Sequence, residues 1–526
     1  MIKSYFKIAW RNLIRNKVSS FINIGGLAVG MAVAILIGLW IYDELSFNKY
    51  HRNYSGIVRL MERITINGEV RTGMYLSMPV APEIRKLYPD EFRHVVRSSF
   101  VEEHAMANGE KKINHTGVFM EPDGPEMFTL KMLRGIRNGL KDPYSIMLSE
   151  SLAKTLFGKV DPITKTLKID GKADVIVTGV YEDIPRNSEF NDLAYIAPWD
   201  LYLQINPWMQ YWKGNWNNSM LQLFVQLAPA ATMEGTAAKI KNVKFNHLTA
   251  EEKRFKPEIF LHPMSKWHLY GEFKNGVNTG GAIQYVWLFG IIGLFVLLLA
   301  CINFMNLSTA RAEKRGREIG IRKAVGSARR QLIYQFLSES LFMAVISFLI
   351  AFLLVQQSLP LFNKISDKQM SIVWTKPLFW IFSVGFIVIT GFIAGSYPAL
   401  YLSSFHPLKV LKGTFRVGRL AALPRKILVV IQFTVSVSLI IGAIVVFRQI
   451  QFAKNRPVGY TRDGLVYARM LTDDIHNHFD AFRNELLETG SVVDLSESNG
   501  AVTEIAENTG QRYHGGFLLL PLQEQC

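Results

Sequence analysis

The sequence predicts an α-helical membrane protein with five transmembrane helices and a large α+β extracytoplasmic domain. Of the 526 residues, 49% are apolar and 12% aromatic, and the formal net charge is +16. Five separate segments hold about 20 apolar residues each, enough to cross a bilayer as a helix. This composition excludes a disordered chain, a collagen-like fibre and a disulfide scaffold. The two cysteines, Cys301 and Cys526, cannot build a disulfide framework.

The apolar runs place the spans, and the stretches between them define the other parts of the chain. A cleavable signal peptide is the alternative for the first span, but its apolar run is too long and no small-residue cleavage site precedes Asp43. The expected parts are an amphipathic interface helix (1–20), the first span (21–42), an external domain (43–282), the second to fourth spans (283–304, 341–361 and 378–400), a basic linker (403–426), the fifth span (427–447) and a second external segment (448–526).

The interface helix is predicted from a spacing of four residues. Lys3, Lys7, Arg11 and Arg15 would lie along one helical face, where they could contact anionic lipid headgroups. Membrane lipid is therefore an expected partner. A generic basic flank accounts for the same residues equally well and leads to the same topology.

The distribution of charge predicts the orientation. The first 20 residues hold five basic and no acidic side chains, residues 311–330 hold eight basic and two acidic ones, and residues 403–426 hold six basic and none acidic. All three segments lie on one side if the N-terminus is cytoplasmic, which is the orientation that we expect. A nucleic-acid partner is not expected, because the basic residues sit in short pieces beside the spans and not on one folded face.

The spans contain small residues but no charges near their middle. The absence of intramembrane Asp, Glu, Lys and Arg argues against an ion-coupled transporter. Small residues recur every four positions, a spacing that lets helices pack closely. The expected packing positions are Gly26, Gly30, Ala34, Gly38, Gly391, Gly395, Ser438 and Gly442.

Turn and cap signals predict an antiparallel sheet with packed helices in the external domain. Asn67-Gly68, Asn108-Gly109 and Asp170-Gly171 each divide two strand-like runs, which is typical of hairpins. Ser149 should cap a helix that runs through Leu156 and ends before Gly158. Another helix should start at Pro82 and stop before Pro89.

Motifs for catalysis and for metal binding are missing from the sequence. HExxH, GxSxG, CxxC and the phosphate-binding loop do not occur, and the histidines of the external domain are scattered. We therefore expect no enzymatic activity, no bound cofactor and no metal site.

The most informative stretch follows the second span, from Asn303 to Glu339. Arg315, Arg322 and Arg329 repeat every seven residues, while an apolar helical face is formed by Ile321, Ala324, Val325, Ala328 and Leu332. The residues predict a short, basic, amphipathic helix just beyond the membrane. It could bind lipid or dock into a protein groove, and the residue pattern alone leaves both readings open.

The same stretch, REIGIRKAVGSARRQLIYQFLSES, resembles the cytoplasmic signature of the FtsX-like and MacB-like permeases of ABC transporters. FKIAWRNLIRNKVSSFINIGGLAVG at the start and LSESLAKTLFGKVDPITKTLKIDG in the external domain are similar to the same family. The resemblance implies a MacB-like periplasmic core domain over 43–282 and an FtsX-like permease domain over 283–402, with a coupling loop at 306–332. It also implies that this loop docks on a separate ATPase subunit through Arg317, Glu318, Gly320, Arg322, Lys323, Gly326 and Arg329.

The resemblance implies a permease subunit that couples ATP hydrolysis by its partner to export or to mechanical work outside the cell. ATP would bind to the partner, and an extracytoplasmic adaptor or substrate protein is a further possible partner. A membrane receptor with an external sensor domain is the alternative. Large family members repeat this architecture, so the sequence after the fifth span is interpreted as the start of a second unit in a truncated, frameshifted or incompletely assembled product. Reversing the charge of Arg322 and Lys323 should weaken ATPase association without affecting membrane insertion.

Overall fold

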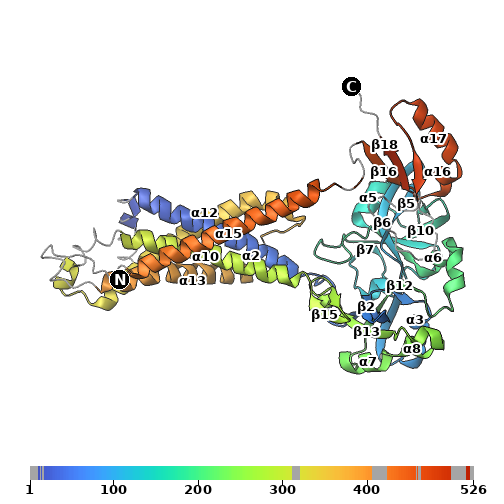
Figure 1. The fold of residues 1–526 in the computed structure, drawn as a ribbon, viewed down its shortest axis with the longest axis horizontal. Helices are drawn as coiled ribbons and strands as arrows, with labels where there is room; N and C mark the ends of the chain where they lie inside the picture. Colours follow the sequence, from blue (N-terminus) through green and yellow to red (C-terminus); the bar gives the residue numbers. More distant parts are fainter. Residues whose placement is uncertain are drawn as a thin grey trace. The chain divides into compact units, whose positions relative to one another are not determined.

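The computed structural model describes residues 10–11, 13–14, 17–310, 320–372, 374–404, 423–457, 459, 464–498 and 517–521. Its contacts divide the chain into two units (Figure 1). The helical unit contains Met1–Leu45 and Ile283–Arg456, and the α+β unit contains Ser46–Ala282 and Pro457–Cys526. Most of the predicted interface helix lies outside the described residues.

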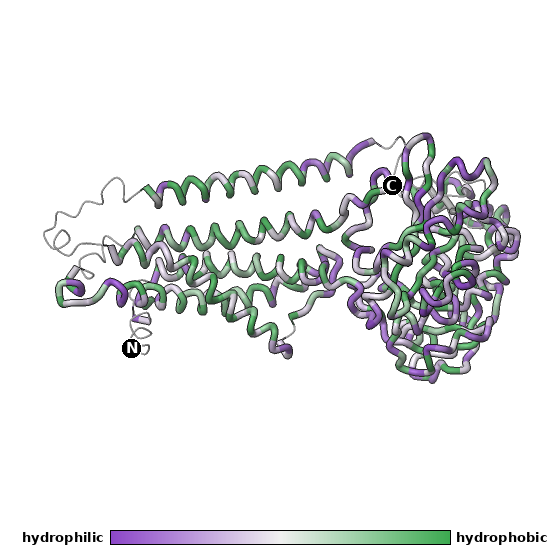
Figure 2. Tube along the Cα trace, turned by 90° about the horizontal axis from the view of Figure 1, so that it is seen from below, coloured by the Kyte–Doolittle hydropathy of each residue, from purple (hydrophilic) through white to green (hydrophobic). Residues whose placement is uncertain are grey.

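Five long helices form the helical unit, and each is long and apolar enough to span a membrane. Apolar residues follow one another along these helices in Figure 2. Every helix extends beyond the apolar run that predicted it, because the polar flanking residues continue the backbone hydrogen bonding. The helices are α2 (Lys17–Leu45), α10 (Ile283–Ala310), α12 (Arg329–Ser366), α13 (Pro377–Ser403) and α15 (Leu423–Asn455).

Four of these helices share one apolar core. Helix α2 packs against α10 and α12, and α12 also packs against α13. Helix α15 contacts α10, where Asn306 Nδ2 donates to Gln432 Oε1 over 3.4 Å, but none of its described side chains is buried. The fully buried residues of the core are Ala28, Met31, Cys301, Ala344, Ala351, Val355 and Ala394.

Close approach between helices depends on glycine at particular positions. A Cβ atom added to Gly30 of α2 would lie 2.4 Å from the Cβ of Ala300 in α10, and one added to Gly26 would lie 3.4 Å from Asn303 Nδ2. In α13, the corresponding distances are 2.7 Å from Gly395 to the Cβ of Ser340 and 3.0 Å from Gly391 to Leu341 Cδ1. The helix backbones therefore meet at these four glycines.

At the other four expected packing positions, no close approach between helix backbones is seen. A Cβ added at Gly38 or Gly442 would meet nothing within 4 Å. Ala34 is half-buried in α2, and Ser438 of α15 is exposed. The close contacts thus lie between α2 and α10 and between α12 and α13.

The α+β unit is built on a thirteen-stranded sheet. Its main path runs β11-β8-β10-β9-β5-β6-β4-β12-β1-β13, with β2 on β1, β3 on β12 and β7 on β10. Most pairs are antiparallel, while β8 with β10 and β6 with β11 are parallel. The strands are β1 (Ile57–Ile66), β2 (Glu69–Gly73), β3 (Leu76–Ser77), β4 (Phe92–Ser98), β5 (Glu102–Asn108), β6 (Lys111–Met120), β7 (Met132–Gly135), β8 (Ser145–Ser149), β9 (Thr166–Ile169), β10 (Ala173–Tyr181), β11 (Tyr195–Pro198), β12 (Ser219–Leu227) and β13 (Glu258–Pro263).

Short helices and one further hairpin complete this part of the chain. The hairpin pairs β14 (Glu272–Lys274) with β15 (Val277–Gly280). The helices are α3 (Val80–Leu87), α4 (Gly124–Met127), α5 (Glu150–Phe157), α6 (Trp199–Ile205), α7 (Met233–Ile240), α8 (Val243–Asn246) and α9 (Ala250–Lys253), with 3₁₀ turns at Pro207–Trp212 and Met264–Lys266.

The three predicted hairpins are confirmed. Each turn contains a glycine with positive φ: 86° at Gly68, 60° at Gly109 and 70° at Gly171. These turns join β1 to β2, β5 to β6 and β9 to β10. Glycine is favoured at such backbone angles because it has no Cβ to clash.

One helix prediction is confirmed and another is shifted. The Ser149 side chain accepts a hydrogen bond from Leu152 N at the start of α5, which ends before Gly158. Helix α3 begins at Val80, two residues earlier than the predicted start at Pro82. Its third position accommodates proline, because the first-turn N–H groups of a helix have no intrahelical partner.

The described residues after Pro457 form a small subdomain. Strand β18 (Phe517–Pro521) lies between β16 (Leu465–Arg469) and β17 (Ser496–Ser498) in a three-stranded sheet. Helices α16 (Asp473–Asn477) and α17 (Phe479–Glu488) accompany it, and the small apolar core contains Met470 and Leu495.

Candidate functional site

The candidate site is the segment 320–328, which leads into α12. Residues 320–324 are helical, and Gly326 follows with a φ of 101°. Val325 N donates to Ile321 O over 3.0 Å and Ser327 N donates to Arg322 O over 3.0 Å, which closes the helix. The left-handed backbone at Gly326 then turns the chain toward α12, as glycine commonly does after a helix.

Two basic side chains attach this segment to two long helices, and Arg329 at the start of α12 joins the same two helices. Arg322 Nη1 donates to Gln335 Oε1 of α12 over 2.8 Å. Lys323 Nζ donates to the Ser403 carbonyl at the end of α13 over 2.6 Å, and Arg329 Nε donates to Ser403 Oγ over 3.4 Å. The last carbonyls of a helix lack intrahelical partners and carry partial negative charge, so they attract cations. Burial, together with the charge of Arg329, lowers the pKa of Lys323.

Apolar packing supports these polar contacts. Leu332 and Phe336 of α12 are buried against Ala399 and Leu402 of α13. The segment therefore contacts two helices that also pack against each other.

The outer face of the segment is apolar and exposed. Val325 is 83% exposed and Ile321 is 48% exposed, while Ala324 between them is also exposed. Leu332, which shares their predicted helical face, is only 2% exposed because it belongs to the junction with α13. The arrangement presents an apolar surface on a basic support, which suits binding to another protein.

The structure describes five of the seven predicted coupling residues. Arg317 and Glu318 lie outside the described residues, and Gly320 is buried. Gly326 forms the turn, and the basic residues contact α12 and α13. Sequence reasoning missed Gln335 and Ser403, whose only signal is that polar residues interrupt or end apolar runs.

A second polar cluster joins the C-terminal end of α2 to the residues just after the C-terminal end of α12. Lys368 Nζ lies 2.9 Å from Asp43 Oδ2 and 2.8 Å from Glu44 Oε1. Burial acts to lower the pKa of Lys368, but the hydrogen bonds to Glu44 and Asp43 outweigh it, so that the pKa is raised. The cluster fixes the end of α2 to the loop after α12.

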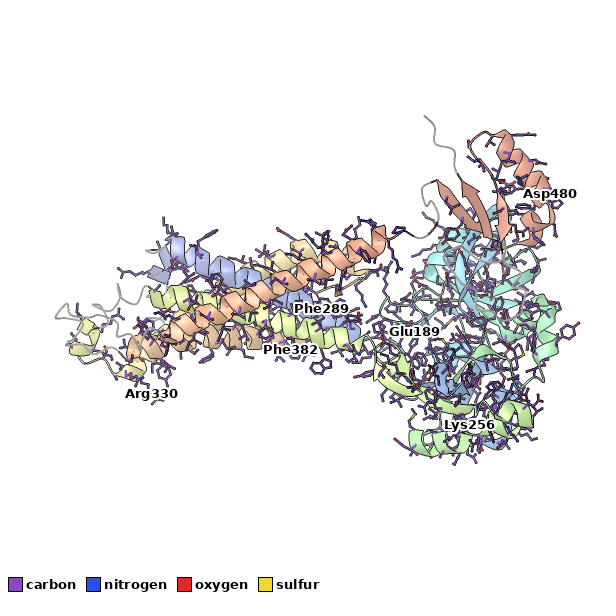
Figure 3. All side chains as sticks on the ribbon, viewed as in Figure 1. Glu189, Lys256, Phe289, Arg330, Phe382 and Asp480 are labelled. Atoms are coloured by element: carbon purple, nitrogen blue, oxygen red, sulfur yellow. The ribbon has the colours of Figure 1, made fainter. Side chains whose placement is uncertain are left out.

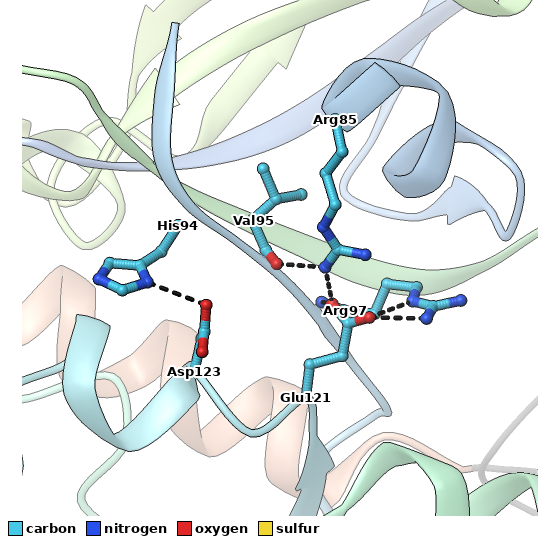
Figure 4. Close-up of polar contacts among 6 residues, drawn as sticks. All are labelled: Arg85, His94, Val95, Arg97, Glu121 and Asp123. Carbon is cyan, nitrogen blue, oxygen red and sulfur yellow. Dashed lines mark hydrogen bonds and ion pairs between the residues drawn. The ribbon is translucent and has the colours of Figure 1, made fainter. Parts of the chain in front are cut away.

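Within the α+β unit, Glu121 forms the centre of an ion-pair network (Figure 4). Arg97 donates to Glu121 Oε1 through Nε over 2.9 Å and through Nη2 over 2.6 Å, and Arg85 donates to Oε2. Nearby, His94 Nδ1 lies 3.0 Å from Asp123 Oδ2. Both oxygens of Glu121 are occupied, so the network connects α3, β4 and the end of β6 and offers no reactive group.

Metal-binding clusters are also absent from the described part of the chain: nowhere in it do three or more His, Cys, Asp or Glu side chains come together in a way that could hold a metal ion. The exposed apolar face of segment 320–328 therefore remains the main candidate.

Comparison with known proteins gives two family matches. The model of the MacB-like periplasmic core domain matches residues 20–243, and the model of the FtsX-like permease C-terminal domain matches residues 290–407. Among curated proteins, the chain is 27% identical over 269 residues to the uncharacterized ABC transporter permease YknZ of Bacillus subtilis, covering 51% of this chain and 61% of YknZ. It is 32% identical over 134 residues to the macrolide export ATP-binding/permease protein MacB of Bdellovibrio bacteriovorus, covering 24% of this chain and 19% of MacB. The chain thus matches less than two thirds of the length of either relative.

Solved structures of the corresponding domains are more distant. The periplasmic region of MacB from Actinobacillus actinomycetemcomitans is 14% identical, with a TM-score of 0.28, and the match covers 40% of this chain and 91% of that one. The extracellular domain of YknZ is 16% identical, also with a TM-score of 0.28, and the match covers 39% of this chain and 99% of that one.

Proposed function

Because the chain belongs to the family of MacB-like and FtsX-like ABC transporter permeases, we propose that it is the membrane-spanning subunit of an ABC transporter driven by a separate cytoplasmic ATPase. ATP binds to that partner, and this chain transmits its movement. The helical unit lies in a bacterial inner membrane with the N-terminus in the cytoplasm, and the α+β unit lies outside.

Segment 320–328 carries the proposal. It follows one long apolar helix, precedes another, and presents Ile321 and Val325 outward. Two of its basic side chains form hydrogen bonds with the long helices: Arg322 with α12 and Lys323 with α13. Docking of the ATPase on this surface would therefore move two spans together.

The uncharged interior of the spans supports mechanical transmission. None of the five predicted spans carries Asp, Glu, Lys or Arg near its middle, so the residues that ion pathways generally require are missing. Transmission needs two arrangements of the helices whose balance depends on nucleotide. The expected output is export or mechanical work outside the cell, with an adaptor or a substrate protein as the external partner.

The docking surface is tested by Ile321→Asp with Val325→Asp. The double variant should lose at least about tenfold in affinity for the ATPase, because two carboxylates would be desolvated in an apolar contact. Co-purification of the tagged chain with its ATPase, followed by a binding titration in nanodiscs, measures the effect.

Ile136→Asp with Val160→Asp is the matched control, since both residues are exposed and lie in the α+β unit, outside the spans. This control should keep wild-type affinity for the ATPase. Equal ATPase binding by the Ile321/Val325 variant and the wild type would remove the docking assignment.

A further inference from the structure

A cavity of about 290 Å³ opens in the α+β unit, and its lining comes from five separate segments. Arg59 belongs to β1, Tyr75 precedes β3, and Phe100 follows β4. Glu189 and Asp192 belong to the loop between β10 and β11, and β12 supplies the fifth segment. Glu189 is labelled in Figure 3.

The charge of Arg59 is already balanced. Its side chain is only 7% exposed, and Nη2 donates to Glu189 Oε1 over 2.9 Å. The guanidinium carbon also lies 4.5 Å from the ring centroid of Trp267 and 5.4 Å from that of Phe224. An anionic ligand would have to displace Glu189 from this partly buried pair, so Arg59 does not make the cavity an anion site.

Asp192 is the third charged residue of the cavity lining, beside Arg59 and Glu189. Its side chain is exposed and forms no ion pair with any residue that the structure describes. The charged groups of the lining are therefore one cation and two carboxylates, which favours a ligand with a single positive charge.

The rings of Tyr75 and Phe100 form an aromatic pair beside this charge. Their centroids are 4.7 Å apart at an interplanar angle of 65°. Aromatic faces attract both cations and apolar groups. The volume is near the lower end of ligand pockets, which span roughly 300–1,000 Å³, so the cavity suits one charged group on a short apolar stem.

Hydrogen bonds order the part of the loop between β10 and β11 that carries Glu189 and Asp192. Asn48 Oδ1 accepts from Glu189 N over 2.8 Å and from Ser188 Oγ over 3.3 Å. His51 Nε2 lies 3.2 Å from the same hydroxyl, and Asn191 N donates to Ser188 O over 3.2 Å. A loop ordered before binding loses less entropy when a ligand arrives.

We propose that this cavity binds a monocationic amphipathic group, an ammonium on a short apolar stem. The Asp192 carboxylate pairs with the ammonium, and the stem lies against Tyr75 and Phe100. A small organic amine and the lysine side chain of a peptide share this chemistry.

Equilibrium dialysis of the full chain in phosphatidylcholine nanodiscs tests the site, with uptake by empty nanodiscs subtracted. The two probes are 4-phenylbutylamine and the peptide acetyl-Leu-Lys-Leu-amide, and 4-phenylbutanol is the uncharged counterpart of the amine. Asp192→Asn should weaken binding of the cationic probes about tenfold, and Phe100→Leu should weaken it about threefold. Asp90→Asn changes an exposed aspartate outside the lining and should have no effect.

Binding of either cationic probe with this dependence on Asp192 supports the proposal, and the probe that binds identifies the source. Equal binding by Asp192→Asn and the wild type would overturn it. So would uptake of 4-phenylbutanol as strong as that of the amine, or uptake of both cationic probes no greater than that of empty nanodiscs. Glu189→Gln is unsuitable as a test, because it would leave Arg59 buried without its partner.

Discussion

His51 shows how burial changes the pKa of a single side chain. It is 1% exposed, its Nδ1 lies 2.6 Å from the Phe128 carbonyl oxygen and its Nε2 lies 3.2 Å from Ser188 Oγ. Burial lowers the pKa of His51 from 6.5 to about 4. Burial, together with the charges of Arg59 and Lys266, lowers the pKa of His262 to about 4 as well.

These histidines predict a loss of stability in acid. Between pH 6.5 and pH 4 the unfolded chain binds protons that the folded chain does not bind, so the free energy of unfolding falls as pH falls. Each histidine lowers the free energy of unfolding by about 1.4 kcal/mol for every pH unit of acidification in this window. Below pH 4 both states are protonated, and the histidine has no further effect. Urea unfolding of the α+β unit in the full chain, followed by tryptophan fluorescence, measures the slope. His51→Gln should reduce the slope by the contribution of one histidine, and an unchanged slope would contradict this account.

Individual residues also show what spacing does not reveal. Arg322 and Lys323 are predicted to contact the ATPase, and within this chain each also contacts a long helix. Lys323 and Ser403 are 80 positions apart, so no local pattern links them. Reversing the charge of Lys323 would therefore also loosen the support of the docking surface, and Ile321 and Val325 give the sharper test.

Elements follow from the sequence wherever their signals lie within a few residues. The turn at Gly68 and the cap at Ser149 are local backbone requirements, and both are visible in the sequence. The five long helices follow from continuous apolar runs. Which faces of these helices meet could not be predicted, because a spacing of four occurs both where helices touch, as at Gly30, and where they do not, as at Gly38.

Gly30 and Gly38 provide a matched pair for helix packing. Gly30→Ala would bring a methyl group to 2.4 Å from the Cβ of Ala300, so α2 and α10 must separate. Overpacking of this kind costs about 1–3 kcal/mol. Gly38→Ala meets nothing within 4 Å and should not destabilise the chain. Thermal unfolding in detergent should show a lower midpoint for Gly30→Ala alone, and equal midpoints for the two variants would argue against close packing at Gly30.

For the whole molecule, the connection between the two units at the end of α2 is short. Asp43 and Glu44 pair with Lys368 inside the helical unit. Inside the α+β unit, Asn187 Nδ2 donates to Ser46 Oγ over 3.0 Å, and Asn48 N donates to Asn187 O over 2.7 Å. Only Leu45 separates these two sets of contacts along the chain.

Two glycines inserted between Leu45 and Ser46 should therefore uncouple the units. ATPase binding should persist, while nucleotide should no longer change amide hydrogen exchange at residues 187–191, because a flexible insertion absorbs movement of α2. Hydrogen exchange by mass spectrometry, with and without a nonhydrolysable ATP analogue, measures this. The same insertion after Gly214, in an open loop, is the control and should leave the nucleotide response intact. A nucleotide response that survived the insertion at Leu45 would show that another connection transmits the movement.

The loop at 187–191 contacts Ser46 at its start and lines the cavity through Glu189. Asn187 forms a hydrogen bond with Ser46, and two residues later Glu189 forms an ion pair with Arg59. A ligand that ordered this loop would therefore also restrict Ser46, the first residue of the α+β unit.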